Sequence, residues 1–417
     1  MTTDTNKSNV TVERVGYRGV GVAHAASGKT ILVRGALPGE VVDVSVVRSH
    51  RTYDEAELAA VVSPSASRLP PACPYARDRL CPGCTYQHVE YPEEVRIKQS
   101  QIEELLERTA AGRPAAPLPF LPPVPSPSPL HYRNKVALHG FRRGEQLTLG
   151  YVGFDNRTIV DIEACPLAAE ALNEALPEAR EAAASTGGDG RFRMTLRFTE
   201  TDGVCWWSRG SVRAARLPRG EGKRLTEVSR HLGPLEVPLQ SFYQVNAPVA
   251  DEIARGVTAL MREIAPALVA DVYCGVGFFA LAAAEAGIEH VLGVDTDRRA
   301  VAAARRNAAA RGLERRVEFQ CADAAAAADG ILSPLSERKD GAVILDPPRR
   351  GLDPRLLEAL CAAKVGHLVY ISCAPDTLAR DVRQLRQAGY LIRSARLHDM
   401  FPRTAAFETM VHLTIDQ

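Results

Sequence analysis

The stretch LVYISCAP, residues 368–375, decides the fold of this chain. An apolar run with strand character ends at Cys373, and an Arg- and Leu-rich helical pattern follows from Asp376 to Gly389. Side chains at the carboxyl end of a strand in an open α/β sheet point into the ligand crevice. A lone cysteine is more often a small apolar core residue, so the role of Cys373 depends on the strand ends around it.

The first of these strand ends is a glycine-containing turn. An apolar run leads into YCGVGFF, residues 273–279, and then into an Ala-rich helical pattern. Gly275 and Gly277 let a ligand approach the backbone closely. The next strand pattern ends in Asp295, 24 residues after Asp271, where an acid can bind ribose hydroxyls. Folds that bind NAD and folds that bind S-adenosylmethionine (SAM) share this logic, and the single G-x-G favours SAM.

The third strand end is AVILDPPRRG, residues 342–351. A buried strand pattern ends in Asp346, and two prolines stiffen the loop after it. Asp-Pro is also a common way to start a turn without any ligand. Between the glycine turn and Cys373, however, the loop is placed to form the substrate side of a site. Three successive strand ends therefore carry a ligand-binding acid, a rigid acidic loop and a thiol.

With these motifs the sequence resembles the SAM-dependent RNA uracil-5-methyltransferases, which act on ribosomal or transfer RNA. The resemblance runs from about Val10 to the last residues. Its most specific parts are D-x-Y-C-G-x-G-x-F-x-L from Asp271, D-P-P-R-x-G from Asp346, S-C-x-P-x-T-L-A-R-D from Ser372, and Phe401 to Glu408. It implies an α/β fold: a Rossmann-like class I SAM methyltransferase domain with an N-terminal OB-like β-barrel (TRAM) and a central α+β RNA-binding domain.

The resemblance also implies residue roles. Cys373 would add to C6 of uracil, and Glu408 would remove the C5 proton. The implied cofactor-binding residues are Gln244, Tyr273, Gly275, Gly277, Phe278, Asp295, Asp323 and Asp346, the last of these at the SAM amino end or the methyl pocket. One departure is visible, because Ala406 stands where the family pattern F-P-x-T-x-H-x-E has histidine.

Length, charge and composition limit the number of domains, the mode of RNA binding and the expected location of the protein. A chain of 417 residues has room for two or three domains, and a net charge of +1 gives no global basic field, so RNA binding must use local patches. No apolar stretch is long enough to span a membrane, and the polar residues 1–9 lack the apolar core of a signal peptide. We therefore expect a cytoplasmic protein, most simply a monomer. Nine cysteines in that compartment indicate metal binding or catalysis rather than disulfides.

The N-terminal region predicts a small barrel. Short strand patterns, punctuated by glycines, cover Val10–Val15, Thr30–Val33, Glu40–Val47 and Ala56–Val62. These features resemble the TRAM domain, an RNA-binding module. Seven basic residues balance seven acidic ones over residues 1–64, so a purely structural appendage is the alternative.

A cysteine group follows the barrel pattern. Cys73, Cys81 and Cys84 lie in a Pro-rich segment, and Cys165-Pro166 is the natural source of a fourth ligand. Four thiolates suit zinc or an iron–sulfur cluster, and spacing alone does not separate the two. The family resemblance favours [4Fe–4S].

The central region alternates strands and turns around one helix near Ala168 to Ala184. Between Arg191 and Arg224 nine basic residues face three acidic ones, with Trp206 and Trp207 among them. Basic side chains mixed with aromatic rings suit single-stranded RNA. The alternating Arg191, Arg193 and Arg197 are equally compatible with a solvated strand face.

We therefore predict an enzyme that methylates C5 of a uridine in RNA, with 23S ribosomal RNA as the expected substrate. A transfer RNA enzyme of the same class, a non-catalytic RNA-binding protein and a redox sensor that uses the cluster are the alternatives. The predicted domains are residues 1–64 (barrel), 65–88 with 113–240 (cysteine cluster and RNA binding), and 89–112 with 241–417 (catalysis). Helices are expected at 89–107 and 248–264, and residues 113–129 form an extended Pro-rich linker.

Overall fold

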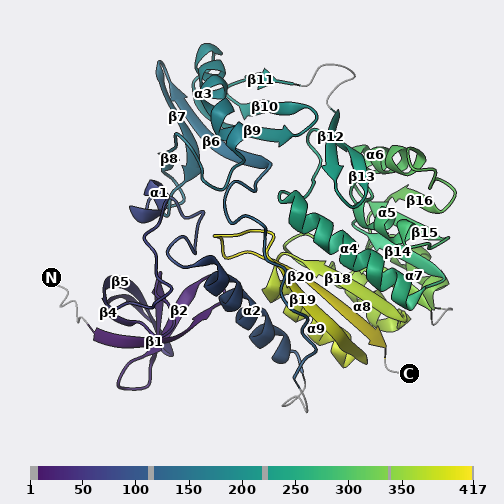
Figure 1. The fold of residues 1–417 in the computed structure, drawn as a ribbon, viewed down its shortest axis with the longest axis horizontal. Coiled ribbons are helices and arrows are strands. Elements are labelled where there is room, and N and C mark those ends of the chain that lie inside the picture. Colours follow the sequence, from purple (N-terminus) through teal and green to yellow (C-terminus); the bar gives the residue numbers. More distant parts are fainter. Residues whose placement is uncertain (1–7, 111–116, 218–223, 337–339, 416–417) are drawn as a thin grey trace. The chain divides into compact units, whose positions relative to one another are not determined.

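The computed structural model describes residues 8–110, 117–217, 224–336 and 340–415 (Figure 1). Its contacts divide the chain into two compact units. The first unit comprises Met1–Gln101, Tyr151–Val160 and Phe401–Ala406. The second comprises Ile102–Gly150, Asp161–Met400 and Phe407–Gln417. The three domains expected from the sequence, with their boundaries, stay a prediction.

The first unit contains the predicted closed barrel. Its strands are β1 (Ser8–Gly16), β2 (Val20–His24), β3 (Thr30–Arg34), β4 (Val41–Ser49) and β5 (Tyr53–Ser63), closed in the order β1-β2-β3-β5-β4. Alternate valine, isoleucine and alanine side chains fill its interior. The sequence pattern missed β2 because its glycines indicate a turn. Gly21 lies within the strand instead, where an added Cβ would meet the Val33 carbonyl at 3.0 Å, so the close backbone approach needs glycine.

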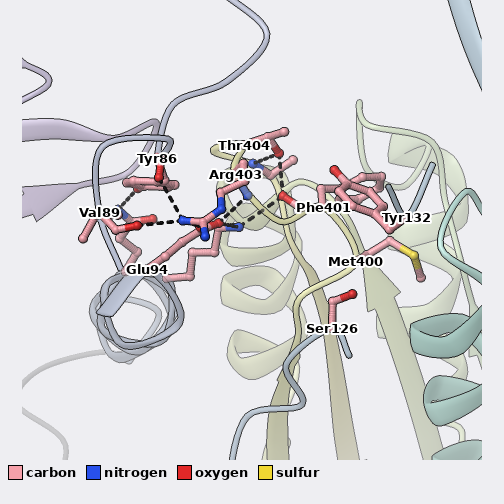
Figure 2. Close-up of polar contacts among 12 residues, drawn as sticks. Tyr86, Val89, Glu94, Ser126, Tyr132, Met400, Phe401, Arg403 and Thr404 are labelled. Carbon is pink, nitrogen blue, oxygen red and sulfur yellow. Dashed lines mark hydrogen bonds and ion pairs between the residues drawn. The ribbon is translucent and has the colours of Figure 1, made fainter. Parts of the chain in front are cut away.

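A network of buried charges holds part of the first unit together. It is built on α2 (Tyr91–Glu107), which follows the short α1 (Pro74–Arg77). Glu94 and Lys98 form an ion pair of 2.7 Å with both side chains fully buried. The backbone N–H of Arg403 donates to Glu94 at 2.6 Å, and its guanidinium donates to the Val89 carbonyl at 2.7 Å (Figure 2). Lys98 also donates to the carbonyl of Phe401 at 3.2 Å, so α2 fixes the loop that precedes Glu408 in the chain.

This network predicts a large loss of stability for Glu94→Gln. The substitution would leave the fully buried Lys98 and the largely buried Arg403 without their carboxylate. Breaking a buried pair on one side costs about 3–5 kcal/mol. Urea unfolding should show this loss. The control is Glu93→Gln on the same helix, whose partner Arg96 is mostly exposed and whose loss should cost about 1 kcal/mol or less. Equal losses for the two variants would contradict the prediction.

The central region is built on a six-stranded sheet, most of which lies in the second unit. Its strands are β6 (Lys135–Arg143), β7 (Gln146–Val152), β8 (Ile159–Asp161), β9 (Gly190–Thr199), β10 (Gly203–Gly210) and β11 (Ala215–Arg216), in the order β11-β10-β9-β6-β7-β8. The helix α3 (Glu170–Ser185) packs against β6, β9 and β10 (Figure 1). A hairpin of β12 (Arg224–Ser229) and β13 (Gly233–Pro238) was not predicted.

Two residues of the predicted basic and aromatic stretch are not available to RNA. Arg197 is only 1% exposed and pairs with Glu227 at 2.7 Å. Trp206 is only 2% exposed, because it lies on the sheet face that α3 covers. The prediction was wrong for both residues, since one-dimensional charge counting does not show which strand residues a hairpin or helix will cover. Arg191 and Arg193 are exposed, as expected.

The catalytic region is a seven-stranded sheet, which confirms the α/β prediction. Its strands are β14 (Leu268–Val272), β15 (Val291–Asp295), β16 (Val317–Cys321), β17 (Gly341–Leu345), β18 (His367–Ser372), β19 (Tyr390–His398) and β20 (Glu408–Ile415). Their order is β16-β15-β14-β17-β18-β20-β19, with only β20 antiparallel to its neighbours. The strand order reverses beside β14, and ligands bind at such a switch point.

In the described part of the chain, six helices accompany this sheet. They are α4 (Ala247–Ile264), α5 (Phe278–Glu285), α6 (Arg298–Ala309), α7 (Ala328–Ser336), α8 (Pro354–Ala363) and α9 (Pro375–Gln387). Side chains from α7, α8 and α9 share one core with Ala270 and Val272 of β14. The alternate residue Asp271 points to the other face, where it bonds to α5. Ile102 and Leu106 of α2 belong to the same core as Ala270 and Val272.

The Pro-rich linker is extended where it is described, as predicted, and its first residues, 113–116, lie outside the described residues. Leu121 donates to the carbonyl of Ala395 and Val124 to that of Leu397, each at 2.8 Å. The segment therefore covers the edge strand β19, which would otherwise present unpaired backbone groups. No helix within the described ranges is long and apolar enough to cross a membrane.

Candidate active site

The turn after β14 is shaped to hold a ligand against its backbone. Gly275 has φ +54°, and an added Cβ there would meet no atom within 4 Å, so the turn is open on that side. Gly277 has φ +87°, and a Cβ would come within 2.8 Å of Phe319, so this position excludes any side chain. The helix α5 begins directly after Gly277.

Two acids support this turn. Asp271 is fully buried and accepts the Ala280 N–H at 2.7 Å, which fixes the start of α5, and burial raises its pKa to about 8. Asp295 accepts the Gly275 N–H at 2.9 Å and the Asp297 N–H at 2.8 Å. A carboxylate has about four acceptor sites, so Asp295 can still accept hydrogen bonds from ribose hydroxyls at the end of β15. Together the turn and Asp295 fit the adenosine part of SAM.

The other predicted cofactor residues lie in different surroundings. Tyr273 adopts φ +72° and is half-buried. Gln244 is 5% exposed, and its carbonyl accepts from Asn134 at 3.3 Å. The ring of Phe278 is buried edge-on against Tyr243, with 5.7 Å between the ring centroids. Asp323 is exposed and accepts the N–H groups of two following alanines at 3.0 Å.

Strand register brings the predicted nucleophile and base together. Ser372, the last residue of β18, pairs with Thr409 of β20. Cys373 therefore leaves β18 beside Glu408, the first residue of β20. Cys373 is half-buried and Glu408 is 4% exposed. Burial, followed by the charge of Glu408, raises the pKa of the Cys373 thiol to about 12. Burial and then Asp346 raise the pKa of Glu408 well above its usual value.

Arg349 also belongs to this site, although the sequence analysis assigned no role to it. Its guanidinium lowers the pKa of the Cys373 thiol, against the larger effect of burial. It also lowers the pKa of Glu408. Asp346, at the start of the same loop, has a pKa of about 7, raised by burial and then by Asp295. One arginine thus acts on both the Cys373 thiol and the Glu408 carboxyl group, and its place in D-P-P-R-R-G was the available signal.

The loop that carries Asp346 and Arg349 is fastened to α9. The buried Asp381 accepts the Tyr370 hydroxyl at 2.7 Å and the Leu352 N–H at 2.9 Å. Thr377 donates to the Arg349 carbonyl at 3.2 Å. These bonds explain physically why a T-L-A-R-D sequence follows the cysteine, since α9 holds the arginine loop against the strand that presents Cys373.

The comparison with known proteins agrees with this geometry. A family described as tRNA (Uracil-5-)-methyltransferase matches residues 234–415, and the TRAM domain matches residues 6–59. The 23S rRNA (uracil(1939)-C(5))-methyltransferase RlmD of Acidithiobacillus ferrooxidans is 32% identical, over 96% of both chains. The chain belongs to the RNA uracil-5-methyltransferase family. The TRAM prediction is thereby confirmed.

Two further proteins are similar to this chain over nearly its full length. The RlmD protein of Pseudomonas aeruginosa is 31% identical, over 97% of this chain and 93% of that one. A crystal structure of the tRNA (uracil-54, C5)-methyltransferase of Pyrococcus abyssi with S-adenosyl-L-homocysteine is 25% identical. It covers 98% of this chain and 100% of its own, with a TM-score of 0.71. SAM as the methyl donor is thus supported by the family and by a structure with the demethylated cofactor bound.

The structure does not show the metal site that the sequence predicts. Cys73 is buried, while Cys81, Cys84 and Cys165 are half-buried. The Gln87 amide donates to the sulfur of Cys84 at 3.5 Å, and the Gly83 N–H donates to that of Cys81 at 3.5 Å. Among the described residues no group of three or more His, Cys, Asp or Glu side chains is arranged to hold a metal ion. The ligand set stays a prediction from the sequence.

The turn geometry predicts weaker cofactor binding for Asp295→Ala. The variant loses acceptors for ribose hydroxyls and the bond that holds Gly275 in place. Charge-assisted hydrogen bonds of this kind contribute about 1–3 kcal/mol. Calorimetry with S-adenosylhomocysteine should show the loss, and NAD should not bind comparably to either protein. The exposed Asp329 of α7 supplies a control, since Asp329→Ala should keep the wild-type affinity. An unchanged affinity in Asp295→Ala would remove this residue from the site.

Proposed function

We propose that the protein methylates C5 of a uridine in 23S ribosomal RNA, with Cys373 as nucleophile and Glu408 as base. The observation that carries the proposal is the β18–β20 register, which sets a strand-end thiol beside a buried carboxyl group. The glycine turn with Asp295 supports cofactor binding in the same sheet. A target uridine in folded RNA must first be splayed out to reach such a site.

The chemistry follows from the weakness of uracil C5 as a nucleophile. Attack of the Cys373 sulfur on C6 places negative charge on C5 and O4, so covalent catalysis replaces one difficult step with two easier ones. The thiol pKa of about 12 means that the free protein holds a neutral thiol near pH 7. The thiol releases its proton to solvent, and Arg349 stabilises the thiolate that forms. When bound, SAM supplies an electrophilic methyl group, which C5 accepts.

Elimination completes the reaction. Glu408 takes the C5 proton, the C5–C6 double bond re-forms, and the C6–S bond breaks to release Cys373. Burial raises the pKa of Glu408, so the side chain is a stronger base than an exposed carboxylate whenever it is in its ionised form. Asp346 is assigned to the SAM amino group or the methyl pocket. Gln244, Tyr273, Phe278 and Asp323 are assigned to the remainder of the cofactor site.

Ribosomal RNA is favoured over transfer RNA by the relatives that match at about full length, which are named as 23S rRNA enzymes. The structural match to a transfer RNA enzyme makes that substrate the second candidate. The test is methyl transfer from labelled SAM to purified 23S rRNA and to unmodified tRNA, followed by mapping of 5-methyluridine. Labelling of tRNA alone would overturn the ribosomal assignment and leave the reaction class intact.

We also propose that Cys73, Cys81, Cys84 and Cys165 bind a [4Fe–4S] cluster, as the cysteine grouping and the family resemblance suggest. Anaerobically purified protein should be brown and should contain iron and sulfide. Single Cys→Ala variants of the four should lose the colour, whereas Cys361→Ala should keep it. Colourless protein with stoichiometric zinc would reject the iron assignment and retain the four-thiolate ligation.

A further inference from the structure

One face of the six-stranded sheet is covered, and the opposite face carries a distinct set of side chains. On β9, Phe192, Met194 and Leu196 are buried on the side of α3, while Arg191 and Arg193 are exposed on the other side. We call this other side the open face. Its near end is closed by the β12–β13 hairpin, where Arg197 is buried against Glu227.

Strand register shows which residues share the open face. Arg193 pairs with His139 of β6 on one side and with Arg209 of β10 on the other, so these three form a row across the sheet. In the next row Arg191 pairs with Phe141, and beyond it Arg143 ends β6. Directly opposite residues have Cβ atoms about 5 Å apart, so each row is continuous.

The open face is basic and partly aromatic. Its residues are Ala137, His139, Phe141 and Arg143 of β6, Arg191 and Arg193 of β9, Trp207 and Arg209 of β10, and Gln146, Thr148 and Gly150 of β7. None of them is acidic. Phe141 is 41% exposed, so its ring is accessible to a ligand on this face. No ion pair is formed by Arg193 within the described part of the chain.

The open face leads toward the catalytic domain. Asn134, the residue before β6, donates its N–H to the Val245 carbonyl at 3.0 Å and its side-chain amide to the Gln244 carbonyl at 3.3 Å. From Lys135 to Phe141 a strand spans about 20 Å. The arginines and rings therefore lie on a sheet whose strand β6 begins beside the segment assigned to the cofactor.

We propose that the open face binds a single-stranded part of the RNA substrate, with Arg191 and Arg193 on phosphates and Phe141 and His139 stacked on bases. This inference rests on the proposed function, since it names the surface that holds the same substrate. Guanidinium groups match phosphate geometry, and exposed aromatic rings on a sheet are a platform for unstacked bases. A surface with rings and no acids fits a polyanion with flat bases better than an acidic protein.

The test compares Arg191→Ala/Arg193→Ala with Arg255→Ala, an exposed arginine of α4 paired with Glu252. RNA affinity is measured by fluorescence anisotropy with a 23S rRNA fragment and with oligouridylate at several salt concentrations. We expect the double variant to bind about tenfold or more weakly. The slope of log affinity against log salt should fall by about 1.4, because each lost phosphate contact on a single strand removes about 0.7. Phe141→Leu should weaken binding without changing that slope.

Kinetics separate this inference from the proposed function. The double variant should have a higher KM for RNA, with kcat and S-adenosylhomocysteine affinity unchanged, and Arg191→Lys/Arg193→Lys should restore most of the salt slope. Wild-type methylation together with equal RNA affinity and slope in the double variant and Arg255→Ala would overturn the inference alone. Wild-type protein that neither binds nor methylates RNA would overturn both. Loss of a co-purifying protein from the variant, with RNA binding intact, would reassign the face to a protein partner.

Discussion

Cys373→Ala should abolish methyl transfer, with a loss of about 10⁴-fold or more, as expected when the nucleophile of a covalent mechanism is removed. The reason is chemical: without addition at C6, C5 of uracil carries too little negative charge to attack the methyl group. Binding should survive, because the glycine turn and Asp295 hold the cofactor without help from the thiol. Single-turnover assays with labelled SAM, together with calorimetry for S-adenosylhomocysteine, measure both quantities.

A second cysteine supplies the matched control for this prediction. Cys361 of α8 is half-buried, and burial raises its thiol pKa, as it does for Cys373. It lies at no strand end, so Cys361→Ala should keep near wild-type turnover. The pH dependence adds a further criterion. Because the Cys373 pKa is about 12, the attack rate should rise with pH across the neutral range. Near-normal turnover in Cys373→Ala would exclude the covalent mechanism.

The parts of the fold that sequence alone predicted share one property: they are local. Hydrophobic periodicity and the position of a proline predict the strand before Cys373 and the helix after it. In the structure, β18 and α9 lie within a residue or two of the expected bounds. The glycine turn is equally local, because positive φ angles favour glycine at Gly275 and Gly277.

The parts that sequence did not predict depend on contacts between distant segments. Arg197 has the same strand periodicity as Arg193, yet the β12–β13 hairpin places Glu227 against it and buries it. Arg403 occupies a variable position of its motif, and only the fold sets its N–H on Glu94. An ion pair between distant segments, or the burial of a strand residue by a distant hairpin, leaves no pattern in the local sequence. Neither could therefore be inferred from residue spacing.

The alanine at position 406, where the family pattern has histidine, raises the question of which group accepts the C5 proton. The family pattern has histidine there, and the structure supplies a different histidine nearby. His398 is the register partner of Glu408 across β19 and β20 and is fully buried. Burial lowers its pKa to about 3, so it is a neutral imidazole. Neither of its ring nitrogens has a hydrogen-bond partner among the described residues, so His398 is the acceptor to test if Glu408 is not the base, although its low pKa makes it a weak base.

Glu408→Gln distinguishes these assignments by where the reaction stops. An amide cannot accept the C5 proton, so addition and methyl transfer should proceed while elimination fails, and turnover should fall by about 10²- to 10⁴-fold. RNA should then stay attached to Cys373 in an adduct that survives denaturing electrophoresis and contains the labelled methyl group.

The matched double variant Cys373→Ala/Glu408→Gln should form no such adduct, which identifies the sulfur in the bond. His398→Gln should accumulate no adduct if Glu408 is the base. Normal turnover without adduct in Glu408→Gln, together with trapped RNA in His398→Gln, would instead assign the base to His398. An adduct that lacks the methyl label would place Glu408 before methyl transfer rather than after it. Only the methyl-labelled adduct in Glu408→Gln agrees with the order of steps that the β18–β20 register suggests.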